Sequence, residues 1–165
     1  MLAAGEGRRV GHDTNKVLLP LAGRRVFTWA IRWARHLPHV VHTVLVIREQ
    51  DRPTIEASLA REVGPPEVTV VVGGDTRHGS EWNALQALAP LINSGQVDVV
   101  VIHDAARPLA STALFARNRR GVGGRRRDPS HPNARIDHPR PRSPVQDHGV
   151  AAVQTPQAFV AAPLA

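Results

Sequence analysis

The chain has 165 residues, contains no cysteine and carries a formal net charge of +7. This length accommodates one domain with a sizeable hydrophobic core, and the absence of cysteine excludes disulfides and cysteine-ligated metal sites. No apolar run has the features of a signal segment or the length of a membrane span, so we expect a cytoplasmic protein.

The positive charge is concentrated in one segment of the chain. Residues 116–150 contain nine arginines and three aspartates, a balance of +6, whereas the remaining residues balance at +1. A segment rich in arginine, proline and glycine, without apolar periodicity, is predicted to be disordered or irregular. Nucleic-acid-binding domains usually present basic side chains on one folded face together with aromatic residues, so this charge does not favour a nucleic-acid partner.

Strands and helices are predicted to alternate along the first 115 residues. The patterns indicate a strand end and loop at 1–7, helices at 26–37, 51–62, 80–91 and 111–115, and strands at 43–47, 68–72 and 97–102. Such alternation predicts a mainly parallel sheet with right-handed crossovers. We therefore predict an α/β fold, a Rossmann-like three-layer sandwich, with residues 1–165 as one domain that includes the irregular segment 116–150.

Some side chains have predicted structural roles in these elements. Trp29 and Trp33 extend the apolar stripe of the helix at 26–37, and we expect both in the core. Asp51 is expected to cap the helix that follows it, and Ser80 to open the helix at 80–91.

The strand that ends in Val99–Ile102, with the residues after it, is the most informative segment. Four β-branched residues in a row are typical of a strand buried on both faces of a parallel sheet. In open α/β sheets the ligand lies just past the carboxyl ends of the strands, where Asp104 and Arg107 would emerge. His103 is expected to be a packed, orienting residue and not a general base.

Two glycine-containing segments fit the same kind of site. Gly5 and Gly7 are followed at position 16 by the only lysine of the chain. This combination is typical of a loop that binds phosphate with cationic partners. The segment 73–80 is typical of a strand end, a glycine turn and the polar start of a helix.

Together with Thr155–Phe159, these segments resemble the 2-C-methyl-D-erythritol 4-phosphate cytidylyltransferase family in their order and approximate spacing. The resemblance implies the fold of nucleotide-diphosphosugar transferases. It also implies an enzyme of isoprenoid-precursor synthesis that transfers CMP from CTP to 2-C-methyl-D-erythritol 4-phosphate, releases pyrophosphate and uses magnesium (Mg2+).

Roles for individual residues follow from the same resemblance. Arg9 and Lys16 would be catalytic and stabilise the transition state, Asp104 would bind the ribose and Mg2+, and Arg107 would bind the sugar phosphate. Asn15 stands where the family usually has proline, and we expect this difference to loosen the loop. The implied nucleotide-binding set is Ala3, Ala4, Gly5, Gly7, Ser80, Asp104 and Thr155.

Each of these residues also has a simpler structural interpretation. Asp104 could cap the turn after its strand, and Ser80 could cap a helix. Thr155 could make a local backbone bond in a loop, and Lys16 could be a surface side chain. Arg107 could brace Asp104 instead of reaching a substrate.

The resemblance weakens after residue 115. Family members form homodimers through an arm that follows this strand and holds the sugar phosphate of the neighbouring subunit, and no such arm is recognisable in 116–150. The family's first strand is longer, and a later lysine and aspartate would fall beyond residue 165. We therefore expect a chain that is incomplete at both ends, marginally folded, and weakly active or inactive.

Three other functions stay open at this point. A ribitol-5-phosphate cytidylyltransferase shares the glycine loop and the Gly-Gly-x-x-Arg-x-x-Ser pattern. A catalytically inactive remnant would bind nucleotide without turnover. An arginine-rich adaptor would bind RNA or DNA through residues 116–150 in a salt-dependent manner.

Overall fold

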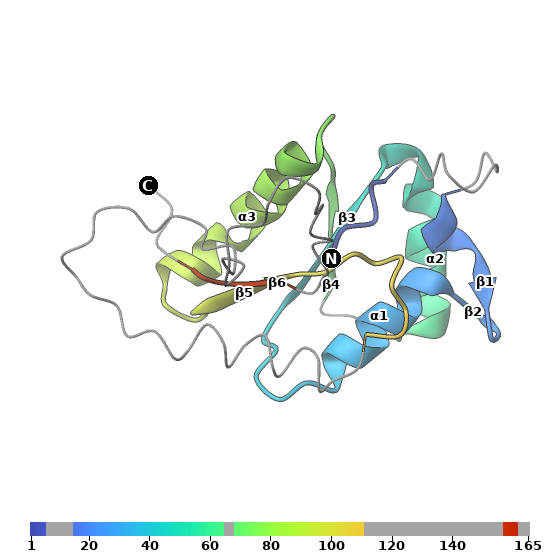
Figure 1. Cartoon of the computed structure of the whole chain (residues 1–165), viewed down its shortest axis with the longest axis horizontal. Helices are drawn as coiled ribbons and strands as arrows, with labels where there is room; N and C mark the ends of the chain where they lie inside the picture. The colour runs from blue at the N-terminus through green and yellow to red at the C-terminus, as the bar shows by residue number, and fades with distance from the viewer. Residues whose placement is uncertain (6–14, 65–67, 111–156, 162–165) are drawn as a thin grey trace, which may run out of the picture.

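A computed structural model of the chain describes residues 1–5, 15–64, 68–110 and 157–161 (Figure 1). The described helices are α1 (Val26–Arg35), α2 (Arg52–Glu62) and α3 (Arg77–Asn93), with the short 3-10 helices η2 (Lys16–Leu18) and η3 (Glu49–Asp51). The described strands are β1 (Pro20–Leu21), β2 (Arg24–Arg25), β3 (Thr43–Ile47), β4 (Val68–Val72), β5 (Val99–Ile102) and β6 (Gln157–Val160). The predicted helix at 111–115 and the segment 116–150 lie outside the described residues.

The first residues of the chain join two parts of a sheet. The N–H of Ala3 donates to the carbonyl of Val46 in β3 at 2.8 Å, and the N–H of Leu2 donates to the carbonyl of His103 after β5 at 2.8 Å. The bridges of Leu2 to Val46 and to Asp104 are both parallel. Residues 1–3 therefore act as a short central strand.

Strand pairing on both sides extends this sheet. β3 and β4 run parallel, with Thr43 opposite Val68 and Ile47 opposite Val72. β5 and β6 run antiparallel, with Val99 opposite Val160. The spatial order is thus β4, β3, residues 1–3, β5 and β6, and the predicted mainly parallel sheet is confirmed.

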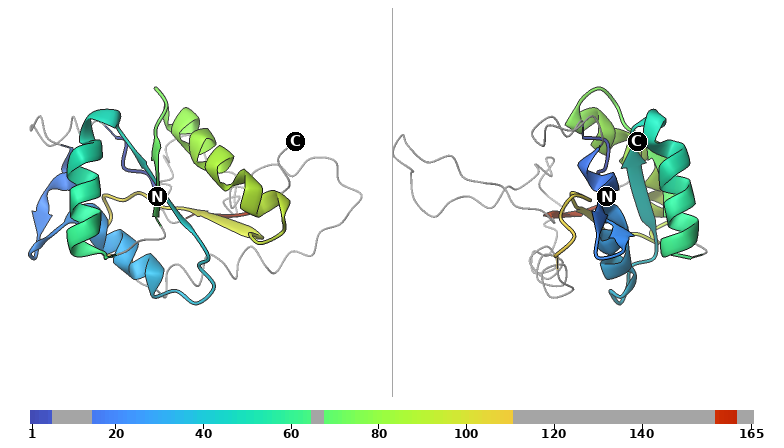
Figure 2. Two further views of the ribbon diagram at one scale, coloured as in Figure 1. Left: turned by 180° about the vertical axis from the view of Figure 1, so that it is seen from behind. Right: turned by 90° about the vertical axis from the view of Figure 1, so that its right-hand side faces the viewer.

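Helices cover both faces of the sheet. In the views of Figures 1 and 2, α1 and α2 lie on one side of β3 and β4, and α3 lies on the other. All five residues of β3 are buried, as expected for a strand covered on both faces. The main core forms on the side of α1 and α2 and consists of Ala3, Val17, Leu18, Phe27, Ile31, Leu45, Ile47, Ile55, Leu59, Val63 and Ala105. The predicted three-layer α/β arrangement is therefore present. None of the described helices is long and apolar enough to cross a membrane.

Both predicted helix caps are wrong. Asp51 stands directly before α2 but makes no side-chain cap bond, because its carboxylate binds Arg48 and Asn15 instead. α3 begins before Ser80, and its cap is Thr76, whose hydroxyl accepts a hydrogen bond from the N–H of Gly79 at 2.9 Å.

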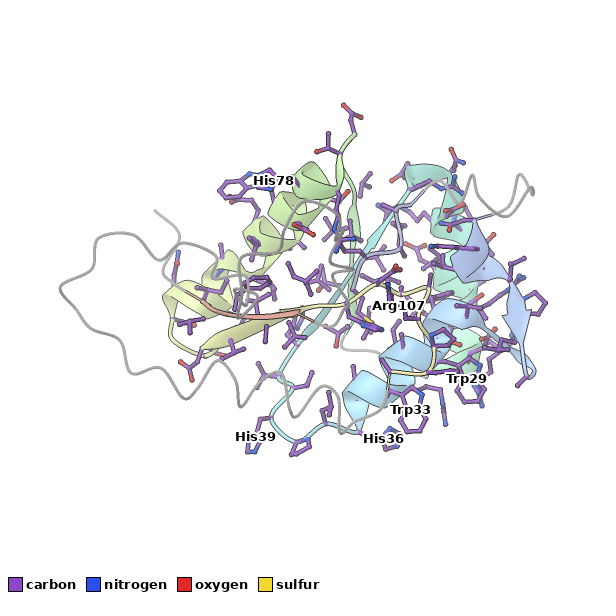
Figure 3. All side chains as sticks on the ribbon, in the orientation of Figure 1. Trp29, Trp33, His36, His39, His78 and Arg107 are labelled. Carbon is purple, nitrogen blue, oxygen red and sulfur yellow. The ribbon has the colours of Figure 1, made fainter. Side chains whose placement is uncertain are left out.

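The predicted burial of Trp33 is also wrong. Trp33 is 39 % exposed, and Trp29 is half-buried. Both point outward along α1 in Figure 3. The indole N–H of Trp29 donates to the carbonyl of Leu21 at 2.9 Å, and the guanidinium of Arg24 lies 5.8 Å from its ring centre. The core side of α1 is already filled by Phe27 and smaller residues, so the larger indoles cover the outer surface.

The carboxylate of Glu62, at the end of α2, caps the beginning of α1. It accepts hydrogen bonds from the N–H of Arg25 at 2.8 Å and from the hydroxyl of Thr28 at 2.9 Å, and it pairs with Arg61 at 2.7 Å. Arg25, at the cap position of α1, has no side-chain cap bond of its own. A carboxylate at a helix N-terminus satisfies free N–H groups and opposes the helix dipole, so Glu62 ties the two helices together.

Replacing Glu62 with glutamine is expected to lower the free energy of unfolding at pH 7 by about 1–3 kcal/mol, because a charged acceptor of buried donors is lost. Burial alone would raise the pKa of Glu62, but its hydrogen bonds with Arg25, Arg61 and Thr28 hold the pKa below the usual range. The unfolded chain therefore takes up the proton first as the pH falls, so the wild-type advantage is complete above the ordinary glutamate pKa and disappears through the lower folded-state pKa.

Urea unfolding of both proteins between pH 7 and pH 3 measures this difference. Glu56→Gln changes an exposed carboxylate in the same helix and serves as the control. A Glu62→Gln deficit that stays constant across this pH range would contradict the capping role.

Candidate functional site

The strand order reverses at residues 1–3, which have β3 on one side and the end of β5 on the other. In open α/β sheets, ligands bind outside the carboxyl ends of the strands at such a reversal. The residues that leave this edge are Ala4 and Gly5 after the first strand, Gly73 and Gly74 after β4, and the segment 104–107 after β5.

Ala3 has a structural role that the sequence did not reveal. It is 1 % exposed, its N–H donates to Val46, and its carbonyl accepts a hydrogen bond from the Asn15 side chain at 2.8 Å. Both main-chain groups of Ala3 already have protein partners, and its nucleotide contact stays a prediction. Ala4 is half-buried and Gly5 is exposed, so their main-chain groups are the ones accessible at the edge.

Gly73 brings the second glycine segment against the first. A Cβ atom at Gly73 would lie 2.7 Å from the hydroxyl oxygen of Ser80 and 2.8 Å from the Cβ of Ala4. Ser80 is buried, and its hydroxyl donates to the carbonyl of Gly74 at 3.3 Å. The absent side chain of Gly73 therefore allows the end of the first strand, the end of β4 and the first turn of α3 to meet.

Asn15 places Lys16 at the same edge. Asn15 is 1 % exposed and binds the carbonyl of Ala3, and Lys16 follows it as the half-exposed first residue of η2. The Asn15 side chain itself is fully packed and hydrogen-bonded, whereas residues 6–14 of the loop, where the loosening is expected, lie outside the described residues. No carboxylate of the described residues lies within ion-pair distance of the Lys16 ammonium.

Asp104 stabilises its own turn and remains partly exposed. One carboxylate oxygen accepts a hydrogen bond from the N–H of Ala106 at 2.9 Å, and the other lies 4.0 Å from Nε of Arg107. The side chain of Asp104 is 28 % exposed and that of Arg107 is 48 % exposed. The turn-capping interpretation of Asp104 is thus present in the structure, and a role toward a ligand is compatible with it.

His103 is packed behind this turn. It is 1 % exposed, and its Nε2 lies 3.2 Å from the carbonyl oxygen of Arg107. Burial lowers the pKa of His103, although the hydrogen bond with the Arg107 carbonyl opposes this shift. His103 therefore orients the segment that carries Asp104 and Arg107.

Most of the described candidates gather at one edge of the sheet. Contacts through the first strand connect Ala4, Gly5, Lys16, Ser80, Asp104 and Arg107 to this edge. Arg9, Gly7 and Thr155 lie outside the described residues, and their roles stay predictions. In the described part of the chain, no group of three or more histidine, aspartate or glutamate side chains could hold a metal ion.

Sequence reasoning missed the hydrogen-bond network by which three residues support this edge. Asp51 and Arg48 form a two-point ion pair, with distances of 2.8 and 3.0 Å, and Asp51 accepts a hydrogen bond from Asn15 at 2.8 Å. The pair Arg48–Asp51 could have been suspected from its three-residue spacing directly after a strand. The long-range partner Asn15 gave no local signal.

Comparisons with known proteins agree with this arrangement. The protein-family model described as 2-C-methyl-D-erythritol 4-phosphate cytidylyltransferase matches residues 1–120. A protein of that name from Parasynechococcus marenigrum is 44% identical over 115 residues, which is 70% of this chain and 48% of the relative. One from Cereibacter sphaeroides is 41% identical over 117 residues, covering 71% of this chain and 49% of the relative.

A solved crystal structure is also similar to the chain in fold and sequence. The crystal structure of 4-diphosphocytidyl-2C-methyl-D-erythritol synthase from Anaerococcus prevotii matches with a TM-score of 0.58 and 28% sequence identity, over 73% of this chain and 47% of that one. The chain thus spans about half the length of the curated relatives it matches. The family match ends close to residue 116, where the composition changes.

The two glycines of the site are expected to respond differently to alanine. Gly73→Ala should lower the free energy of unfolding by about 1–3 kcal/mol, because its Cβ would overlap Ser80 and Ala4. Gly5→Ala should leave stability unchanged within about 0.5 kcal/mol, since a Cβ there meets open space and the backbone is not left-handed. Denaturant unfolding of the two variants makes the comparison, and equal losses would show that Gly5 is also required by the fold.

Proposed function

Because the chain belongs to the 2-C-methyl-D-erythritol 4-phosphate cytidylyltransferase family, we propose that it transfers CMP from CTP to 2-C-methyl-D-erythritol 4-phosphate and releases pyrophosphate. The family assignment supports this reaction. The observation that carries it is the meeting of three motif-bearing segments at the carboxyl edge of the sheet, where α/β proteins bind nucleotides.

The proposed reaction is an in-line displacement. A phosphate oxygen of the acceptor forms a bond to the α-phosphorus of CTP, and the bond from this phosphorus to the oxygen that bridges to the β-phosphate breaks. Pyrophosphate carries away the electron pair. Negative charge grows on the phosphoryl oxygens, so fixed cations and main-chain N–H groups contribute most to the rate.

Residues at the carboxyl edge of the sheet suit the binding of phosphate groups and the stabilisation of their negative charge. Gly5 is exposed and has no side chain, and its main chain is proposed to approach the triphosphate. Lys16 supplies a positive charge, and Arg9 is proposed as its partner on the other side of the transferred group. Ser80 is proposed to contact the nucleoside, and Arg107, which is exposed, to bind the phosphate of the acceptor.

Asp104 fits a magnesium ion held mainly by substrate. Mg2+ usually takes one or two carboxylates and completes its coordination with phosphates and waters. The partly exposed carboxylate of Asp104 provides such a ligand, and its turn fixes the orientation. When bound, the ion would neutralise charge on the triphosphate. Thr155 is proposed to support the nucleotide side of the pocket.

Replacing Lys16 with alanine is expected to lower kcat/KM about 100- to 1000-fold, because one fixed donor to the transition state is lost. The thermal midpoint should stay unchanged, since the side chain is half-exposed. Pyrophosphate release from CTP measures turnover, with Arg32→Ala as a control that removes one positive charge from α1.

Parallel reactions with 2-C-methyl-D-erythritol 4-phosphate and ribitol 5-phosphate identify the acceptor. Turnover with neither acceptor in the wild type would contradict the proposed function.

Replacing Asp104 with asparagine is expected to raise the Mg2+ concentration needed for half-maximal turnover about tenfold or more. An asparagine oxygen can still accept the hydrogen bond from Ala106, so the turn should persist. A magnesium titration of pyrophosphate release measures the effect. An unchanged magnesium requirement together with lower turnover would limit Asp104 to its role in the turn.

A further inference from the structure

We propose that Asn15 is a positioning residue that, together with Asp51 and Arg48, fixes Lys16 relative to the end of the first strand. The inference rests on the proposed function, because it takes Lys16 as the cation that meets the triphosphate. It adds that the place of this cation is set by a buried hydrogen-bond network that begins on β3.

Every polar atom of the Asn15 amide has a protein partner. Its Nδ2 donates to the carbonyl of Ala3 at 2.8 Å and to Oδ2 of Asp51 at 2.8 Å, and its Oδ1 accepts from the N–H of Val17 at 3.3 Å. The reversed amide would set its oxygen against two other oxygens, so these partners determine the orientation. The residue is 1 % exposed, and loss of these bonds would leave buried polar groups unsatisfied.

Asp51 is in turn held by Arg48. The guanidinium meets both carboxylate oxygens, Nε to Oδ2 at 2.8 Å and the terminal nitrogen to Oδ1 at 3.0 Å. Such two-point pairs restrict geometry more than a single bond does. Asp51 is 6 % exposed, so a carboxylate without Arg48 would be a buried, uncompensated charge. The pair therefore presents a fixed acceptor to Asn15.

Both ends of this hydrogen-bond network are attached to strand β3. Arg48 directly follows β3, and Ala3 is itself hydrogen-bonded to Val46 of β3. Asn15 therefore connects two points that the sheet already holds at a set separation. On the other side of Lys16, Val17 and Leu18 are buried in the core. The Lys16 backbone is thus anchored on both sides, which limits the positions that its long side chain can sample.

The electrostatic effect of removing the Asp51 carboxylate and its effect on the position of Lys16 would change triphosphate binding in opposite directions. Removing this carboxylate makes the neighbourhood of Lys16 more positive, so electrostatics alone would strengthen the binding of a triphosphate. Loss of the acceptor of Asn15 would misplace Lys16 and weaken binding. Glu49 allows a matched control, because it lies in the same short helix, pairs with Arg52 at 3.0 Å, and is exposed.

Lys16 can be observed directly, because it is the only lysine of the chain. Labelling with 13Cε-lysine gives one side-chain NMR signal, which is followed while CTP with magnesium is added. The proteins are the full chain as wild type, Asn15→Ala, Asp51→Ala and Glu49→Ala. Two quantities are measured: the CTP concentration that shifts half of the signal, and the position of the signal at saturation. Thermal unfolding of each protein gives its folded fraction.

The inference predicts that the CTP concentration that shifts half of the signal is about ten to a hundred times higher in Asn15→Ala and Asp51→Ala than in the wild type. The reason is that a small misplacement of a group that contacts the substrate has a large effect. It also predicts that their saturated signal lies at a different position, and that Glu49→Ala matches the wild type. Destabilisation alone would reduce the intensity of the folded signal at an unchanged position, and this result would overturn the inference. So would CTP binding by Asp51→Ala as tight as that of Glu49→Ala.

Two further outcomes separate the inference from the proposed function. A wild-type signal that does not respond to CTP would contradict the function, and the inference with it. A normal wild-type response, shared by both network variants, would leave the function standing and overturn only the positioning role. If Asn15→Ala does not fold, Asp51→Ala decides, because it retains the bond between Asn15 and Ala3.

Discussion

The hydrogen bonding of residues 1–3 on both sides is the constraint on which the rest of the structure depends. These residues connect β3 with the end of β5, and without them the two parts of the sheet would not share an edge. Every described element of the site is placed through this short strand. Gly73 contacts its end, Asn15 binds its last carbonyl, and Asp104 follows its parallel neighbour.

Most arginines of the described chain already have hydrogen-bond or ion-pair partners within the protein. Arg24 and Arg35 donate to carbonyls at the end of α2, at 2.7 and 2.6 Å. Arg48, Arg52, Arg61 and Arg77 each pair with a carboxylate. The positive charge of the four arginines paired with carboxylates is thus locally compensated, and this agrees with the low net charge outside 116–150. In the described part of the site, Lys16 and Arg107 are the exposed or half-exposed cations near the edge.

The sequence predicted those features that depend on short-range patterns. The mostly β-branched run at 43–47 predicted strand β3 with its bounds, and apolar spacing predicted α1 to within a few residues. The helix expected at 51–62 matches α2 to within one residue. Family resemblance identified the residues at the sheet edge. The predictions that were wrong concerned features that depend on contacts between residues far apart in the sequence. Asp51 looked like a cap because its neighbours suggest one, whereas its partner Asn15 is 36 residues away. Trp33 fitted the helical stripe, but the space on the core side was already occupied. The cap that Glu62 provides for α1 had no local sequence signal.

The pairing of β5 with β6 has a consequence for how this chain tolerates change. Residues 111–156 separate two stretches that lie side by side at the edge of the sheet, so the sheet itself holds the ends of that stretch together. The entropy lost on joining the ends of a loop grows only logarithmically with length, by about 0.6 kcal/mol for each doubling. Closure entropy by itself therefore adds little to the cost of a longer connection between β5 and β6, as long as Gln157–Val160 can still pair with β5.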